Sequence, residues 1–123
     1  VIRIITLRDM LEVGYSISYK GKADEQIAIL PIGYGDGFPR LLGNKGYVYI
    51  NDVSYQIIGR VNMDTMAISL GGNNHGIEIG AIVEVISDNP RKQNSVKNTA
   101  KILGTIEYDI ITSLSKRVVR KIV

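Results

Sequence analysis

The chain has 123 residues, of which 45% are hydrophobic, and a formal net charge of +3. This length suits one domain with its own core and is short for two. The chain has no cysteine, which excludes a disulfide framework, a zinc ribbon and a cysteine nucleophile within it. Its basic residues are spread out, so we expect no nucleic-acid partner.

Three further features concern the setting of the chain. No apolar run approaches the roughly 20 residues of a membrane span, and no signal-peptide pattern is present, so we expect no membrane contact. The lack of cysteine fits a reducing compartment, and we expect a cytoplasmic protein. The sequence opens at Val1 in a strand-like run rather than at Met. We therefore expect the carboxy-terminal piece of a longer polypeptide.

The first two-thirds of the chain has the spacing of an antiparallel β-structure. Runs rich in Ile and Val predict strands over residues 2–10, 16–19, 28–32, 47–50, 54–58, 66–70 and 81–86. Val13-Gly14 is expected to form a turn and residues 20–25 a polar loop. Strands about ten residues apart indicate an antiparallel barrel or sandwich.

The last third changes character. Residues 95–103 have helical spacing, with Ser95 as a candidate N-cap and Gly104 as a stop. Residues 105–114 predict a second short helix capped by Thr105, and residues 117–123 a closing strand. The predicted fold is therefore mainly all-β: a small antiparallel Greek-key-like β-barrel or sandwich with one or two short helices near the C-terminus.

Two polar clusters stand out because each follows an apolar run. Residues 33–40 follow the predicted strand 28–32, and residues 59–64 follow the run 53–58. A strand that ends in such a cluster delivers the chain to a rim, where a rigid scaffold can present reactive side chains. We therefore expect both clusters to lie at the edge of the β-structure.

The residue types in these clusters suit a small zwitterionic ligand. Tyr34 lies between two glycines, which permit close backbone approach, and Arg40 can attract a carboxylate. Asn62 and Asp64 would face the same side of a strand. The plainer alternatives are an exposed loop tyrosine, an ion pair between Arg60 and Asp64, and a core role for Met63. We expect no metal site, because the single histidine, His75, has no second ligand at a suitable spacing.

Five segments, taken together, resemble the carboxy-terminal β-domain of alanine racemases, pyridoxal-phosphate enzymes with an amino-terminal (β/α)8 barrel. The segments follow one another in the family's order and cover nearly the whole chain. They are residues 13–19, 30–40, 58–64, 104–110 and 117–120. The resemblance implies that residues 1–123 form this one domain and that the barrel is absent from the chain.

The resemblance also implies roles for individual residues. Tyr19 matches one of the two acid/base groups, and Tyr108 matches the tyrosine that hydrogen-bonds the phosphate of pyridoxal 5′-phosphate. Met63 would bind the substrate carboxylate through its backbone N–H, with Asn62 and Asp64 close to the substrate. The access corridor would be formed by Tyr34, Arg40, Arg60 and Ile106.

The activity implied is the interconversion of L- and D-alanine, which supplies D-alanine for peptidoglycan precursors. A lysine of the missing barrel would hold the cofactor covalently and act as the other base. The partners implied are the amino-acid substrate, the chain's own barrel domain and a second subunit in a head-to-tail homodimer. Since the domain of one subunit would complete the active site of the other, the isolated chain is expected to be inactive.

Several alternatives stay open. Asn62 stands where the family commonly has a small or thiol residue, and its amide could favour the hydroxyl of serine, which predicts a serine-preferring racemase. A related basic amino-acid decarboxylase usually contributes a cysteine from this domain, and the chain has none. A small β-barrel binding module without catalysis would also fit the composition. A non-catalytic relative of the family is disfavoured by the presence of both Tyr19 and Met63.

Overall fold

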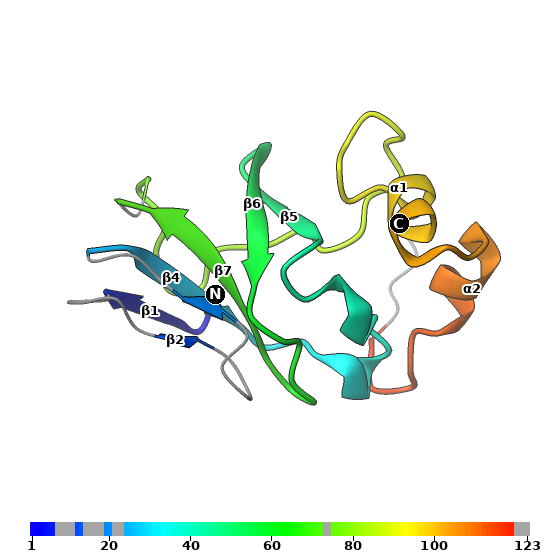
Figure 1. The fold of residues 1–123 in the computed structure, drawn as a ribbon, viewed down its shortest axis with the longest axis horizontal. Helices are drawn as coiled ribbons and strands as arrows, with labels where there is room; N and C mark the ends of the chain where they lie inside the picture. Colours follow the sequence, from blue (N-terminus) through cyan, green and yellow to red (C-terminus); the bar gives the residue numbers. More distant parts are fainter. Residues whose placement is uncertain (7–11, 14–18, 21–23, 73–74, 120–123) are drawn as a thin grey trace.

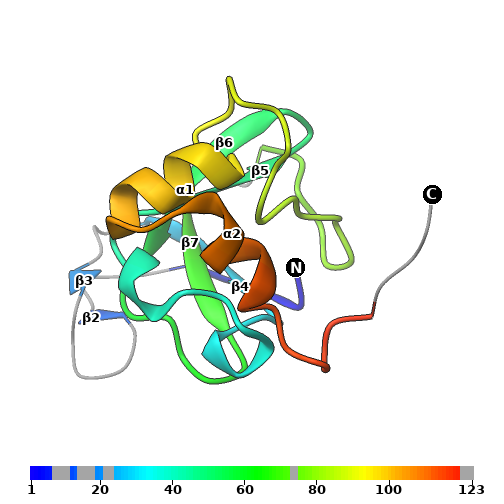
Figure 2. The same ribbon diagram turned by 90° about the vertical axis from the view of Figure 1, so that its right-hand side faces the viewer.

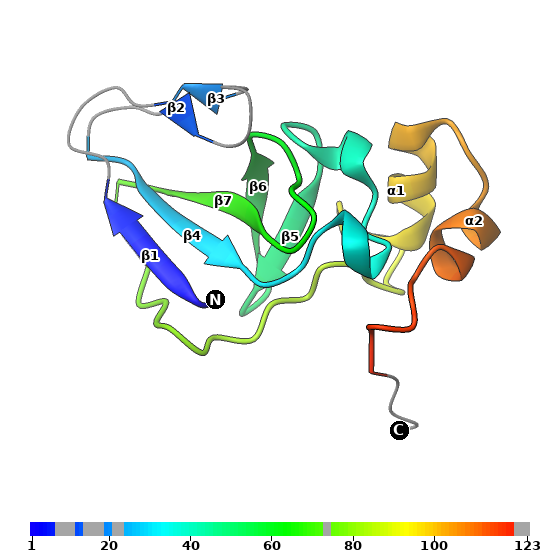
Figure 3. The ribbon, with the colours of Figure 1, turned by 90° about the horizontal axis from the view of Figure 1, so that it is seen from below.

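The computed structural model describes residues 1–6, 12–13, 19–20, 24–72 and 75–119. Five antiparallel strands form one sheet in the order β1-β4-β7-β6-β5, and two short helices lie beyond one end of it (Figures 1 and 3). The predicted mainly all-β class with short helices near the C-terminus is confirmed. The strands are β1 (Arg3–Thr6), β4 (Gln26–Leu30), β5 (Tyr47–Ile50), β6 (Val53–Ile58) and β7 (Met66–Gly71), beside a separate pair, β2 (Glu12–Val13) and β3 (Tyr19–Lys20).

The inner strands of the sheet are apolar on both faces. One face contributes Ala28, Leu30 and Ile68 to the main core. The other face contributes Ile27 and Ala67 to a second, smaller apolar cluster. Since side chains alternate along a strand, burial on both faces requires consecutive apolar residues, and the sequence has them over residues 27–30 in β4 and 66–68 in β7, before Ser69 interrupts the run. These two strands are the rigid base of the site.

The helical end of the domain contains α1 (Val96–Leu103) and α2 (Glu107–Thr112), which pack side by side (Figure 2). The Ser95 hydroxyl accepts the N–H of Asn98 at 3.1 Å, and Gly104 ends α1 in the left-handed conformation, so both predicted signals are confirmed. Thr105 is not the cap of α2. Ile106 occupies that position, and the Thr105 hydroxyl donates to the Asp109 carboxylate instead.

The strand predicted over residues 81–86 is wrong, and the described part of the strand predicted over residues 117–123 is not a strand either. Residues 81–86 meet β5 in a single bridge, Tyr49 with Glu84. The Glu84 carbonyl accepts both the Tyr49 N–H at 3.0 Å and the Asn94 side-chain amide at 2.8 Å, and no other residue of the segment pairs with a described strand. Lys116 and Arg117 lie in a turn and Val118 in a bend, and the N–H groups of Arg117 and Val118 both donate to Ser115.

Smaller differences concern strand ends. The predicted strand 28–32 starts at Gln26 and ends at Leu30, because Pro31 has no N–H for a ladder bond. Val13, expected in a turn, and Lys20, expected in a loop, lie in the pair β2 and β3. Parts of the predictions on residues 2–10, 13–14, 16–19, 20–25 and 117–123 lie outside the described residues. None of the described helices is long and apolar enough to cross a membrane.

Candidate functional site

The two polar clusters meet where strand β4 ends and strand β7 begins, at one end of the inner strands of the sheet. Strands β4 and β7 are antiparallel neighbours, and Leu30 lies opposite Met66, so the chain leaves β4 where it enters β7. The Tyr34 N–H donates to the Asn62 carbonyl at 2.9 Å, and the Gly35 N–H donates to the Met63 carbonyl at 2.8 Å. The predicted rim is therefore confirmed, and it consists of two loops joined by their backbones. We call residues 33–37 the glycine loop and residues 62–65 the Met63 turn.

The glycine loop needs a glycine at position 33 because its backbone lies very close to that of the Met63 turn. A Cβ on Gly33 would lie 2.1 Å from the Asn62 carbonyl oxygen, so no larger residue fits there without a backbone shift. An Asp36 carboxylate oxygen accepts the Gly33 N–H at 3.0 Å and closes the 3-10 turn that carries Tyr34. Gly37 ends this turn with a φ of 92°.

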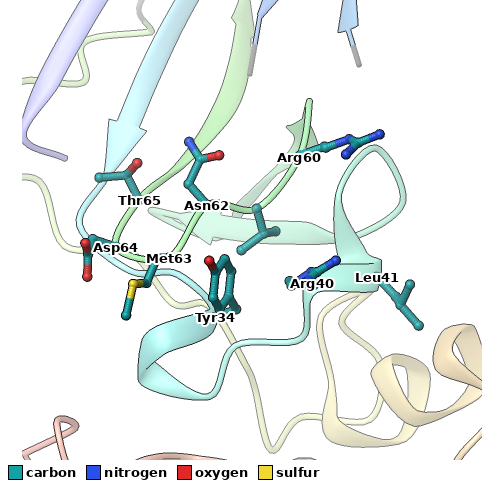
Figure 4. A pocket seen from close by; sticks show the side chains of 9 residues that line it. Tyr34, Arg40, Leu41, Arg60, Asn62, Met63, Asp64 and Thr65 are labelled. Carbon is teal, nitrogen blue, oxygen red and sulfur yellow. The ribbon is translucent and has the colours of Figure 1, made fainter. Parts of the chain in front are cut away.

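The Met63 turn is a loop rather than the continuation of a strand. Strand β6 ends at Ile58 and β7 begins at Met66, and the Asn62 N–H donates to the Thr65 carbonyl at 2.9 Å across the turn. Asn62 and Asp64 therefore do not share a face as strand parity predicted, and Figure 4 shows their side chains pointing apart. Met63 is at the tip. The residue is 53% exposed rather than in the core, and its N–H has no partner among the described residues.

An open pocket of about 920 Å³ lies between the two loops (Figure 4). The Arg40 guanidinium carbon is 5.5 Å from the centre of the Tyr34 ring, within the range of a cation–π contact. Arg40 and Arg60 both line this hollow and make it suitable for a small molecule with a carboxylate. Its lining residues are Tyr34, Arg40, Leu41, Arg60, Val61, Asn62, Met63, Asp64 and Thr65.

Arg117 is a charged residue beside the pocket that sequence reasoning missed. Its Nη2 donates to Asp64 Oδ1 at 2.6 Å, and its Nε lies 3.2 Å from Asp36 Oδ1. The hydrogen bond to Asp64, followed by the negative charge of Asp36, raises the pKa of the Arg117 guanidinium. Asp64 thus pairs with Arg117 and not with Arg60. The sequence shows a basic pair at Lys116-Arg117, but a partner 53 residues away leaves no local pattern.

The described structure brings together six of the nine predicted site residues. Ile106 and Tyr108 lie instead at the helical end, where the two residues are 63% and 69% exposed. Tyr19 lies in β3 opposite Val13, and its side chain is outside the described part of the molecule. The six at the rim are Tyr34, Arg40, Arg60, Asn62, Met63 and Asp64.

Three pocket residues, Leu41, Val61 and Thr65, were not predicted. They adjoin predicted residues in the sequence, but an apolar or hydroxyl side chain beside a polar cluster has no distinguishing pattern. In the described ranges there is also no group of three or more His, Asp or Glu side chains that could hold a metal ion.

Comparison with known proteins gives one consistent result. A model of the family described as "Alanine racemase, C-terminal domain" matches residues 1–122. An alanine racemase of Francisella tularensis subsp. tularensis strain FSC 198 is 52% identical over 123 residues, which is all of this chain and 34% of that protein. The chain thus spans about a third of the length of the curated relatives it matches.

Solved structures of alanine racemases also align with this chain. Alanine racemase from Bartonella henselae with covalently bound pyridoxal phosphate aligns with a TM-score of 0.85 and 32% identity, over 95% of this chain and 32% of that one. Alanine racemase from Bacillus anthracis with bound L-Ala-P aligns with a TM-score of 0.84 and 34% identity, over 96% of this chain and 30% of that one. The paired loops at the rim and these matches lead to one assignment: the chain belongs to the alanine racemase C-terminal domain family.

Proposed function

We propose that this chain is the part of a pyridoxal-phosphate-dependent racemase that supplies an acid/base tyrosine and a carboxylate-binding rim for the interconversion of L- and D-alanine. The observation that carries the proposal is the joining of the glycine loop to the Met63 turn, in a chain that belongs to the family. The product D-alanine would serve peptidoglycan synthesis, in the cytoplasm. As the chain is about a third of its relatives' length, the activity belongs to the longer protein.

The Met63 turn is suited to hold the substrate carboxylate. Met63 lines the pocket and its N–H has no partner among the described residues, so we assign to it the donation of a hydrogen bond to a carboxylate oxygen. Arg40 and Arg60 line the same hollow and would draw the anionic group inward. Tyr34, at the mouth beside Arg40, would limit what passes.

The residues present fit pyridoxal 5′-phosphate, whose anionic phosphate needs hydrogen-bond donors. The Tyr108 side chain is 69% exposed, and its hydroxyl has no partner among the described residues, so it can donate to such a phosphate. When bound, the cofactor supplies the electron sink that makes the α-hydrogen of an amino acid acidic. The lysine that would hold it belongs to the barrel, and no lysine of this chain is assigned that role.

Tyr19 is the residue to which we assign proton transfer. Racemisation removes a proton from one face of Cα and returns one to the opposite face, which requires two groups on opposite sides of the substrate. A phenol with a reference pKa near 10 can serve once neighbouring charge or hydrogen bonds favour its ionised form. The Tyr19 hydroxyl would take or give the proton on one face, and the barrel lysine on the other.

The proposal includes a head-to-tail homodimer in which Tyr19 of one subunit serves the cofactor lysine of the other. Mixed dimers of the full-length protein test this directly. One subunit carries Tyr19→Phe, and the other carries a replacement of the barrel lysine. Each parent homodimer should be inactive, and the mixed dimer should recover up to half of the wild-type activity.

The reason is that a shared site combines the intact tyrosine of one subunit with the intact lysine of the other. If both groups came from the same subunit, no intact site would form in the mixed dimer, and its failure to gain activity would refute the sharing. The isolated 123-residue chain should show no turnover in the same assay.

A second candidate function is a serine-preferring racemase, and Asn62 favours it. Its side chain is half-buried in the pocket and makes no hydrogen bond to the described residues, so it is available to a hydroxylated substrate. A hydrogen bond of this kind is worth about 1–3 kcal/mol in preference. Asn62→Cys in the full-length enzyme should lower the serine-to-alanine ratio of kcat/KM. An unchanged ratio would remove this candidate.

A further inference from the structure

The guanidinium of Arg117 connects the two loops of the rim. Its Nη2 donates to Asp64 in the Met63 turn at 2.6 Å, and its Nε faces Asp36 in the glycine loop at 3.2 Å. The Asp36 side chain is only 14% exposed, so this contact is partly shielded from water. Because a guanidinium is planar and has donors on both sides, it can hold two carboxylates at once, which a lysine ammonium does with less geometric control.

Each of the two carboxylates also belongs to the local structure of its loop. Asp36 uses its other oxygen to accept the Gly33 N–H at 3.0 Å and so closes the turn that carries Tyr34. Asp64 directly follows Met63, and both residues line the pocket. A movement of either carboxylate would therefore move a group that lines the pocket.

Backbone contacts fix the position from which Arg117 acts. The Ser115 N–H donates to the Asp36 carbonyl at 2.9 Å, and the Arg117 N–H donates to the Ser115 hydroxyl at 3.2 Å. The guanidinium also fills the space left by Gly35, where a Cβ would lie 2.2 Å from Arg117 Nη1. The segment after α2 is thus packed against the glycine loop, and its arginine extends across to the Met63 turn.

We propose that Arg117 is a positioning residue that fixes the Met63 N–H relative to Tyr34, and so sets the affinity of the pocket for the substrate carboxylate. This inference rests on the proposed function for its effect on substrate. Arg117 does not line the pocket, so it acts through Asp36 and Asp64 rather than by touching the ligand.

The test uses the full-length protein loaded with pyridoxal phosphate, in the variants Arg117→Met and Arg117→Lys. Lys116→Met removes the same charge from the adjacent exposed residue and is the matched control. For Arg117→Met we expect KM for alanine to rise about tenfold and kcat to change less than about threefold, because the site is misplaced for binding while its reacting groups are kept. Arg117→Lys should resemble Arg117→Met, since charge alone does not restore the bridge.

A second measurement separates this inference from the proposed function. Hydrogen exchange at the amides of Tyr34 and Gly35 reports the backbone bonds between the two loops, with or without catalytic activity. Arg117→Met should speed their exchange and leave the amides of β4 and β7 unchanged. If the wild-type protein does not racemise alanine, the proposed function fails, and this measurement still tests the bridge.

The outcomes that overturn the inference are equally specific. If the amides of Tyr34 and Gly35 exchange in Arg117→Met at the same rate as in the wild-type protein, Arg117 does not hold the two loops together. Faster exchange with an unchanged KM would show that the bridge does not position the substrate. Full activity in Arg117→Lys, or an equal effect of Lys116→Met, would reduce the role of Arg117 to its charge.

Discussion

The rim and the helical end of this domain present their site residues in different ways. At the rim, backbone hydrogen bonds and the bridge through Arg117 hold the glycine loop and the Met63 turn together. At the helical end, Ile106 at the N-cap of α2 and Tyr108 within this six-residue helix are exposed. Contacts within this domain therefore hold the rim in place, whereas the site residues of the helical end are exposed and free to contact another part of the full-length protein. Substitutions at the rim should change stability and activity together, and substitutions of Tyr108 should change activity alone.

The largest structural effect is expected from Gly33→Ala. The new methyl group would meet the Asn62 and Met63 carbonyl oxygens at 2.1 and 2.5 Å and force the two loops apart. Overpacking of this kind costs about 1–3 kcal/mol, so both the melting temperature and kcat/KM should fall. Gly72→Ala is the matched control, because nothing lies within 4 Å of that Cβ position. Equal behaviour of the two variants would mean that the loops are not tightly joined.

Tyr108→Phe should separate activity from stability at the helical end. It removes a hydroxyl that has no partner among the described residues, so thermal unfolding of the cofactor-free protein should not change. A lost hydrogen bond to a charged phosphate costs about 1.5–3 kcal/mol, so the affinity for pyridoxal phosphate should fall by roughly tenfold or more. Tyr47→Phe on β5 is the control. Unchanged cofactor affinity in a fluorescence titration would remove Tyr108 from the phosphate site.

Ser95→Ala, also at the helical end, should lower stability and leave activity unchanged. The buried Ser95 hydroxyl caps α1 through the Asn98 N–H, and loss of such a cap costs about 1 kcal/mol. Chemical denaturation of the full-length protein should show this loss in the transition that includes this domain, while KM for alanine stays at the wild-type value. Ser54→Ala, on an exposed position of β6, is the control. A changed KM would show that the rim depends on α1 more than its contacts indicate.

The smallest effect is expected from Lys92, which should change the stability of the protein only at alkaline pH. Hydrogen bonding to Glu84, followed by that to Asp52, raises the pKa of the Lys92 ammonium above its ordinary value of 10.5. A raised folded pKa means that the stabilisation is present below 10.5 and is lost as the pH rises through the folded value. Wild-type stability should therefore fall more steeply than that of Lys92→Met above this pH. Parallel curves would show that these ion pairs contribute nothing measurable.

Sequence reasoning succeeded where the signal was local. The strands at residues 47–50 and 54–58, the Ser95 cap and the Gly104 stop each follow from residues within one element. It failed where a distant partner decides the conformation. Residues 81–86 look like a strand, but only Glu84 pairs with β5.

The site shows the same division. Both polar clusters were predicted to reach a rim, because each follows an apolar run, and they do. The relative direction of Asn62 and Asp64 was predicted wrongly, because strand parity does not apply in a turn. Arg117 was missed, because its carboxylate partners come from two other loops and only the folded chain brings them together.

The central claim is that Tyr19 transfers a proton on one face of the substrate. The most direct test follows the exchange of the α-hydrogen of L- and D-alanine in deuterated water, using the full-length Tyr19→Phe variant with pyridoxal phosphate. Racemisation should fall by roughly 10²–10⁴-fold, and only one enantiomer should still exchange its α-hydrogen, through the barrel lysine. Exchange of both enantiomers at wild-type rates would contradict the assignment.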